Sequence, residues 1–191
     1  MAYLIAVVGV AGSGKSTLCR AAVSRFPMLV KLVSVTTRSP RASEVDGVDK
    51  YFLDGATFDA RLATGDLFLQ TETYGNRYAV RRADLEGSFT LITELHYANL
   101  QTFRELHPRL VSVCVMPESP KLALDQIGAR GETAQEADLR KGLLWSEYTH
   151  LVDLAQSDSF DYVFVNEFDD ASTERFLGLL SSVLDLLSGS V

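Results

Sequence analysis

Apolar runs that look like β-strands alternate along the chain with segments whose apolar residues recur at helical spacing. The strand-like runs lie at residues 3–8, 29–35, 89–93, 110–115 and 161–165. The helix-like segments lie at residues 15–26, 98–106, 134–155 and after 166, and the longest of them carries Leu144, Trp145 and Leu151 on a face that we expect in the core. Because consecutive parallel strands need a crossover connection, this alternation predicts an α/β fold with a parallel sheet flanked by helices.

Two segments depart from this alternation. Residues 34–83 hold short β-like runs around one short helix, and residues 128–138 are polar and poor in large apolar side chains. We interpret the first segment as a small β-rich, substrate-binding insertion and the second as a mobile lid. The remaining residues then form the core of a single domain that covers residues 1–191, with core segments 1–33, 84–127 and 139–191.

Composition and charge narrow the class of protein. The chain of 191 residues is 47% hydrophobic, which is enough for one full core. Its net charge of -7 argues against a nucleic-acid polymer or an anionic membrane as partner, because the long-range field would repel both. The start of the chain lacks a basic leader region and no apolar run reaches the length of a membrane span, so we expect a cytoplasmic protein that is a monomer or a homodimer.

The segment after the first strand-like run has the spacing of a phosphate-binding loop. Residues 9–16 read GVAGSGKS, which matches the pattern G-x-x-x-x-G-K-[ST] between a strand and a helix. In such a loop the main-chain amides converge on phosphates, the lysine reaches the β and γ oxygens, and the serine hydroxyl ligates Mg²⁺. The predicted site for a nucleoside triphosphate comprises Gly9, Gly12, Ser13, Gly14, Lys15, Ser16 and Thr17.

The acceptor of the phosphate is indicated by a second basic segment. A GTPase would carry an Asn-Lys-x-Asp stretch that reads guanine, and the sequence has none, whereas a kinase needs an acceptor site and a lid. Arg38 and Arg41 lie in a proline-containing loop after a strand, where two guanidinium groups can form a bidentate anion clamp. Taken alone, the segment is equally consistent with a solvated basic loop.

This loop resembles a segment of the guanylate kinase family. Residues 34–52, SVTTRSPRASEVDGVDKYF, are similar to the family's Ser-x-Thr-Thr-Arg-x-Pro-Arg-x-x-Glu and the Gly-Val-Asp that follows. The likeness continues at Gly75-Asn76, at Arg130-Gly131 and in the strand-like run at 160–166. The resemblance implies a P-loop kinase fold with an acceptor-binding insertion and a lid, which uses ATP and Mg²⁺ and phosphorylates a phosphorylated small molecule, by default GMP.

The resemblance also implies roles for individual residues. The acceptor's phosphate would be held by Ser34, Arg38, Arg41 and Tyr78. Arg130, together with Arg140 or Lys141, would close onto the ATP phosphates, and Asn166 would lie near the donor adenine. The residues expected to act on the transferring group are therefore Lys15, Arg38, Arg130 and Arg140.

The sequence departs from the family in the acceptor pocket. Aligned without gaps, Leu69 and Val80 replace a glutamate and a serine or threonine that bind guanine, and each unpaired guanine group would cost about 1 to 3 kcal/mol. Gln70 and Glu72 could substitute only if the strand slipped in register. Lys50, which we count with the acceptor-binding residues, and Arg77 replace tyrosines and are expected to add positive charge.

A further departure concerns the acidic residues after the run at 89–93. The family's Leu-Asp-Ile-Asp segment retains one carboxylate here, that of Glu94, which we predict to contact Mg²⁺ or the acceptor. The alternative is a glutamate at a strand end that faces solvent.

These features leave open three functions. The protein is a guanylate kinase-like enzyme that acts on GMP, or a kinase for another nucleotide or a ribose phosphate. The third alternative is a catalytically inactive module that binds partners through the cleft that held the acceptor in its active relatives. The complete Gly14-Lys15-Ser16 sequence weighs against the inactive module.

Overall fold

A parallel sheet forms the centre of the computed structural model, which describes residues 3–128 and 134–189. In these ranges five parallel strands are arranged in the order β2-β7-β1-β8-β9. They are β1 (Leu4–Val8), β2 (Leu29–Lys31), β7 (Thr90–Leu95), β8 (Leu110–Pro117) and β9 (Tyr162–Asn166). The predicted α/β fold is confirmed, and β1 lies at the middle of the sheet, where the loop that follows it has neighbours on both sides.

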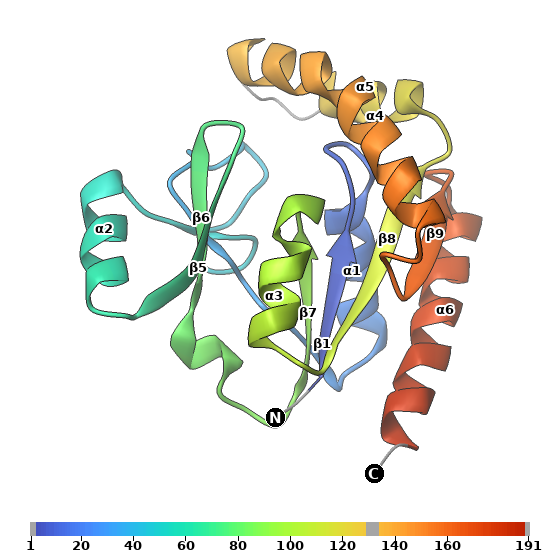
Figure 1. Ribbon diagram of the computed structural model, residues 1–191, viewed down its shortest axis with the longest axis horizontal. Helices are drawn as coiled ribbons and strands as arrows, with labels where there is room; N and C mark the ends of the chain where they lie inside the picture. Colours follow the sequence, from blue (N-terminus) through green and yellow to red (C-terminus); the bar gives the residue numbers. More distant parts are fainter. Residues whose placement is uncertain (1–2, 129–133, 190–191) are drawn as a thin grey trace.

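Helices cover both faces of this sheet, as Figure 1 shows. Side chains of β1 alternate between the faces: Leu4, Ala6 and Val8 pack in one core cluster, and Ile5 and Val7 pack in the other. The first cluster includes residues of α3 (Leu100–Leu106), α4 (Pro120–Gly128) and α5 (Ala134–Gln156), and the second includes residues of α1 (Lys15–Arg25) and α6 (Asp170–Ser188). None of the helices in the described ranges combines the length and the hydropathy that crossing a bilayer requires.

A second, smaller sheet stands beside the core (Figure 1). Within the described part of the chain its strand order is β4-β3-β6-β5, with mixed directions. The strands are β3 (Val35–Thr36), β4 (Tyr51–Phe52), β5 (Leu67–Thr73) and β6 (Asn76–Arg81), and α2 (Gly55–Ala63) packs against them through the buried Phe58. All of these elements fall within residues 34–83. Two short 3-10 turns, η1 (Arg82–Leu85) and η2 (Tyr97–Asn99), precede β7 and α3.

The run at 29–35 was expected as one strand and is divided between the two sheets. Leu29 belongs to the core of the main sheet, whereas Val35 packs with Phe58 and Leu67 in the small core of the second sheet. Leu32 still donates a main-chain hydrogen bond to Ile92 at 2.9 Å, and the chain then crosses to the second sheet. An apolar run cannot indicate that its two ends pack in different cores.

One aromatic residue of α5 lies outside the core, contrary to the sequence prediction. Leu144 and Leu151 are fully buried, but 59% of Trp145 is exposed. Adjacent residues of a helix point about 100° apart, so the stripe that buries Leu144 turns its neighbour toward solvent.

Candidate active site

The phosphate-binding loop connects β1 to α1, as predicted. Gly12 and Gly14 adopt positive φ angles of 78° and 88°, which side chains rarely tolerate. A Cβ atom on Gly12 would also collide with the main-chain oxygen of Ala123. The loop can therefore bend tightly against α4 and lead into the N-terminus of α1, the end of a helix that attracts anions.

Lys15 lies across this loop. Its ammonium group donates hydrogen bonds to the main-chain oxygens of Gly9 at 2.9 Å and Val10 at 2.7 Å. The side chain also lines the acceptor cavity, defined here as the cavity of about 150 Å³ into which Ser34, Arg38, Arg41, Lys50 and Tyr78 project. A phosphate group placed at the loop would meet a lysine that the loop already orients.

Glu94, at the end of β7, faces the phosphate-binding loop. Its Oε2 atom accepts a hydrogen bond of 2.6 Å from the hydroxyl of Ser16, and its Oε1 atom lies 3.9 Å from the ammonium of Lys31. Burial alone would raise the pKa of Glu94, but the charges of Lys50, Lys31 and Lys15 and the hydrogen bond from Ser16 outweigh burial and lower the pKa to about 2. The carboxylate is ionised at neutral pH, and the alternative of a solvent-facing glutamate is wrong.

The pair formed by Ser16 and Glu94 suits Mg²⁺. A hydroxyl and a carboxylate are the hard oxygen ligands that Mg²⁺ prefers, and the ion usually keeps water and substrate phosphates as its other ligands. No cluster of three or more His, Cys, Asp or Glu side chains that could hold a metal occurs among the residues that the structure describes. The protein part of the site thus fits an ion that arrives together with a nucleotide.

Replacing Glu94 with glutamine is expected to raise the Mg²⁺ concentration needed for half-maximal activity and to lower kcat/KM about 100-fold. The amide keeps the shape but removes the negative charge that balances Lys31 and Lys50.

Because the pKa of Glu94 lies below its ordinary value of 4.5, the ionised carboxylate stabilises the fold above that pH, and this contribution is lost as the pH falls toward 2.

The measurement is the rate of ADP formation in a Mg²⁺ titration at pH 7.5. Glu72, which is exposed on β5, provides the matched control Glu72→Gln. An unchanged Mg²⁺ requirement in Glu94→Gln would remove Glu94 from the metal site.

Arg38 and Arg41 converge on Glu44. Arg38 is 5% exposed and its guanidinium donates to Oε1 of Glu44 at 2.8 Å, while the main-chain amide of Arg41 donates to Oε2 at 2.8 Å. Burial would lower the pKa of Arg38, but the hydrogen bond and charge of Glu44 outweigh it and raise that pKa. The alternative of a solvated basic loop is wrong for Arg38. Glu44, the last residue of the resembling motif, contacts both arginines, and sequence reasoning gave it no role.

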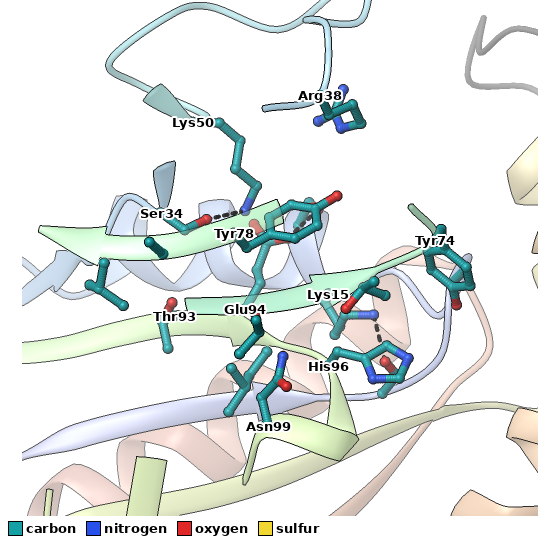
Figure 2. A pocket seen from close by; sticks show the side chains of 18 of the residues that line it. Lys15, Ser34, Arg38, Lys50, Tyr74, Tyr78, Thr93, Glu94, His96 and Asn99 are labelled. Carbon is teal, nitrogen blue, oxygen red and sulfur yellow. Dashed lines mark hydrogen bonds between the residues drawn. The ribbon is translucent and has the colours of Figure 1, made fainter. Parts of the chain in front are cut away.

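Further predicted acceptor residues lie on the same cavity. Lys50 donates a hydrogen bond of 2.9 Å to the hydroxyl of Ser34, and Figure 2 shows Tyr78 beside them and Arg38 above. Arg140, buried on α5, also lines this cavity with its guanidinium 4.8 Å from the centre of the Tyr74 ring. The structure thus places cations from the insertion, the phosphate-binding loop and α5 around one space. Arg130 lies outside the described residues.

Arg77 does not add charge to the acceptor cavity, and this expectation is wrong. The side chain pairs with Asp59 of α2, donates to the main-chain oxygen of Gly55 at 3.2 Å, and stacks over the Phe58 ring. Arg77 adjoins Tyr78 on β6, and adjacent residues of a strand point to opposite faces. Since Tyr78 faces the cavity, Arg77 faces α2.

Leu69 and Val80 both line the acceptor cavity. The pairing of β5 with β6 shifts between Phe68 and Thr71, and Leu69 adopts a positive φ of 57° at this irregularity. Gln70 and Glu72 are exposed and do not replace the missing base-binding residues. The apolar character that the sequence predicted for this part of the pocket is therefore retained.

Asn166 braces the phosphate-binding loop. Its amide donates to the main-chain oxygen of Ser13 at 3.0 Å and accepts from the hydroxyl of Ser172 at 2.8 Å. A Cβ atom on Gly14 would collide with this amide, so the glycine also allows Asn166 to pack against the loop. Asn166 lines a second cavity of about 470 Å³ together with Gly14 and Thr17, and a contact with the donor adenine stays a prediction.

Tyr74, His96 and Glu147 form a polar cluster, called here the polar junction, between parts of the chain that sequence reasoning did not connect. The Tyr74 hydroxyl donates to Oε2 of Glu147 at 2.6 Å, and Nε2 of His96 lies 3.5 Å from Oε1 of the same carboxylate. Burial and the hydrogen bond to Glu147 raise the pKa of Tyr74. These residues come from β5–β6, α5 and the end of β7, and no local pattern could have indicated their contact.

Comparisons with known proteins agree with this geometry. The sequence matches the guanylate kinase family profile over residues 1–176. It is 34% identical over 168 residues to guanylate kinase of Symbiobacterium thermophilum, with 86% of this chain and 77% of that protein covered. For guanylate kinase of Nocardia farcinica the identity is 32%, with 94% and 93% covered. The crystal structure of guanylate kinase from Anaplasma phagocytophilum is similar in fold, with a TM-score of 0.72 at 24% identity over 97% of this chain and 85% of that one. This chain therefore belongs to the guanylate kinase family.

Proposed function

We propose that this protein transfers the γ-phosphate of ATP to GMP, producing ADP and GDP. The observation that carries the proposal is that Lys15 and Ser16 of the phosphate-binding loop line the same cavity as Arg38 and Arg41. A donor phosphate and an acceptor phosphate would then lie next to each other. The relatives described above are named guanylate kinases, so the other expected functions, a kinase for another metabolite and an inactive binding module, are not favoured.

The chemistry proposed for this site is direct, in-line transfer without a covalent enzyme intermediate. Arg38 and Arg41 would hold the acceptor phosphate and reduce its repulsion of the donor, while Lys15 and Arg140 would stabilise the charge spread over the transferring group. Ser16 and Glu94 would hold Mg²⁺, which supplies neutralising charge to the donor phosphates when bound. The lid predicted at 128–138, of which residues 129–133 lie outside the described residues, would exclude water from the site. The cytoplasmic location and the oligomeric state stay predictions.

The test is coupled measurement of ADP formation from ATP and Mg²⁺ with GMP, AMP, CMP, UMP or ribose 5-phosphate. GMP is expected to support formation of ADP and GDP in equal amounts. ADP formation that requires ribose 5-phosphate and not GMP would overturn the proposed acceptor. Acceptor-independent release of ADP would overturn the transfer itself.

A further inference from the structure

The wall of the acceptor cavity opposite Arg38 and Arg41 offers few groups that can hydrogen-bond a nucleotide base (Figure 2). Leu69 and Val80 contribute only apolar surface, and Phe103 of α3 adds more. The hydroxyl of Thr93 is used in a hydrogen bond of 3.3 Å to the main-chain oxygen of Leu32. The hydroxyl of Thr71 can donate or accept in turn, so it selects weakly among bases.

His96 is also engaged within the protein. Its Nδ1 atom accepts from the main-chain amide of Ala98 at 3.4 Å, and its Nε2 atom faces Glu147. The imidazole thus caps the η2 turn through Nδ1, while the buried Nε2 atom lies 3.5 Å from Glu147 and has no hydrogen-bond partner among the described residues. A base placed against His96 would compete with the Glu147 carboxylate for this nitrogen.

Asn99 differs from these neighbours. It directly precedes α3 with helical backbone angles (φ -97°, ψ -6°), because the η2 turn runs into the helix, and its side chain is not used to cap α3. The half-buried side chain lines the cavity, and Figure 2 shows its amide between Thr93 and His96. A carboxamide offers a donor and an acceptor side by side, which is the pairing pattern of a purine edge.

We propose that Asn99 hydrogen-bonds the acceptor base, a role that Leu69 and Val80 cannot fill. The site would then bind 6-oxopurine nucleotides without requiring the 2-amino group of guanine. This inference rests on the proposed transfer to GMP. The amide oxygen accepts from N1–H of the base and the amide nitrogen donates to O6. A carboxylate could instead accept from both N1–H and the 2-amino group of guanine, which a single amide oxygen does less well.

The first part of the test compares GMP with IMP, which lacks the 2-amino group. Wild-type protein is expected to use the two acceptors with kcat/KM values within about fivefold of each other, because one neutral hydrogen bond is worth about tenfold at most. A preference for GMP of 100-fold or more would overturn the inference and leave the proposed function standing. Failure of both acceptors in protein that binds ATP would overturn the inference and the proposed function together.

The second part uses variants of the residue itself. Asn99→Ala is expected to raise KM for both acceptors about tenfold with kcat changed less than about threefold, since the contact holds the base and not the reacting atoms. Asn99→Asp is expected to shift the preference toward GMP by about tenfold, because the carboxylate accepts from the 2-amino group.

Gln101→Ala is the matched control: Gln101 is an exposed amide on the same helix, bonded to Glu105 at 3.1 Å, and its loss should change neither acceptor. Thermal unfolding of each variant checks that the fold is retained. An unchanged KM in Asn99→Ala, or an unchanged GMP to IMP ratio in Asn99→Asp, would overturn the assignment.

Discussion

Lys15→Ala is expected to lower kcat at least about 1000-fold, because it removes the cation that the phosphate-binding loop directs at the transferring group. The ammonium is held by the main-chain oxygens of Gly9 and Val10, so its position is fixed before substrate binds. A preoriented charge costs little reorganisation during the reaction, and its loss therefore affects the rate more than the binding of ATP.

The measurement is ADP formation at saturating ATP and GMP, with ATP binding followed by calorimetry. Lys121→Ala provides the control, because Lys121 is an exposed lysine on α4. Retention of a tenth or more of the wild-type rate in Lys15→Ala would be incompatible with the role given to this lysine.

Arg38→Ala is expected to reduce kcat/KM for GMP by about 100-fold to 1000-fold through loss of a charged, bidentate phosphate ligand. It should also lower the free energy of unfolding by about 1 to 3 kcal/mol, because the half-buried Glu44 carboxylate loses the shorter of its two arginine ion pairs and keeps only the one to Arg41 at 3.5 Å. Arg38→Lys keeps the charge but not the planar fork, so an intermediate activity is expected.

The double variant Arg38→Ala with Glu44→Gln separates the two effects. Removing both charges is expected to restore most of the stability, since no carboxylate remains that has lost its Arg38 partner, while the activity stays low. Urea unfolding and the coupled ADP measurement give the two readouts. Recovery of activity in the double variant would show that Arg38 acts only by neutralising Glu44.

The sequence by itself was sufficient for the fold class and for the position of the glycine-rich loop between β1 and α1, because both depend on local patterns. Alternating apolar strands and helices predicted the parallel sheet, and the loop from Gly9 to Ser16 combines spacing with glycines whose positive φ angles the structure requires. The basic loop was also found correctly, since Arg38 and Arg41 lie three residues apart and close on Glu44 in the same loop.

The direction in which individual side chains point, and the neighbours they pack against, were harder to predict from the sequence. Arg77 was expected at the acceptor but pairs with Asp59, because the neighbouring Tyr78 takes the face that points into the cavity. Trp145 was expected in the core but lies on the outer side of α5. In each case the residue type and approximate position were read correctly, and the direction of the side chain depended on which neighbour became buried.

Only the tertiary structure decided the charge state of Glu94 and the contacts of residues far apart in the chain. Glu94 is ionised because Lys15, Lys31 and Lys50 arrive from three different segments, and their combined charge outweighs the cost of burial. Tyr74 meets Glu147 across 73 positions of sequence. The placement of Asn99 on the cavity wall likewise follows from the packing of α3 against the core, because the direction of a side chain beyond a strand end is set by the elements that surround it.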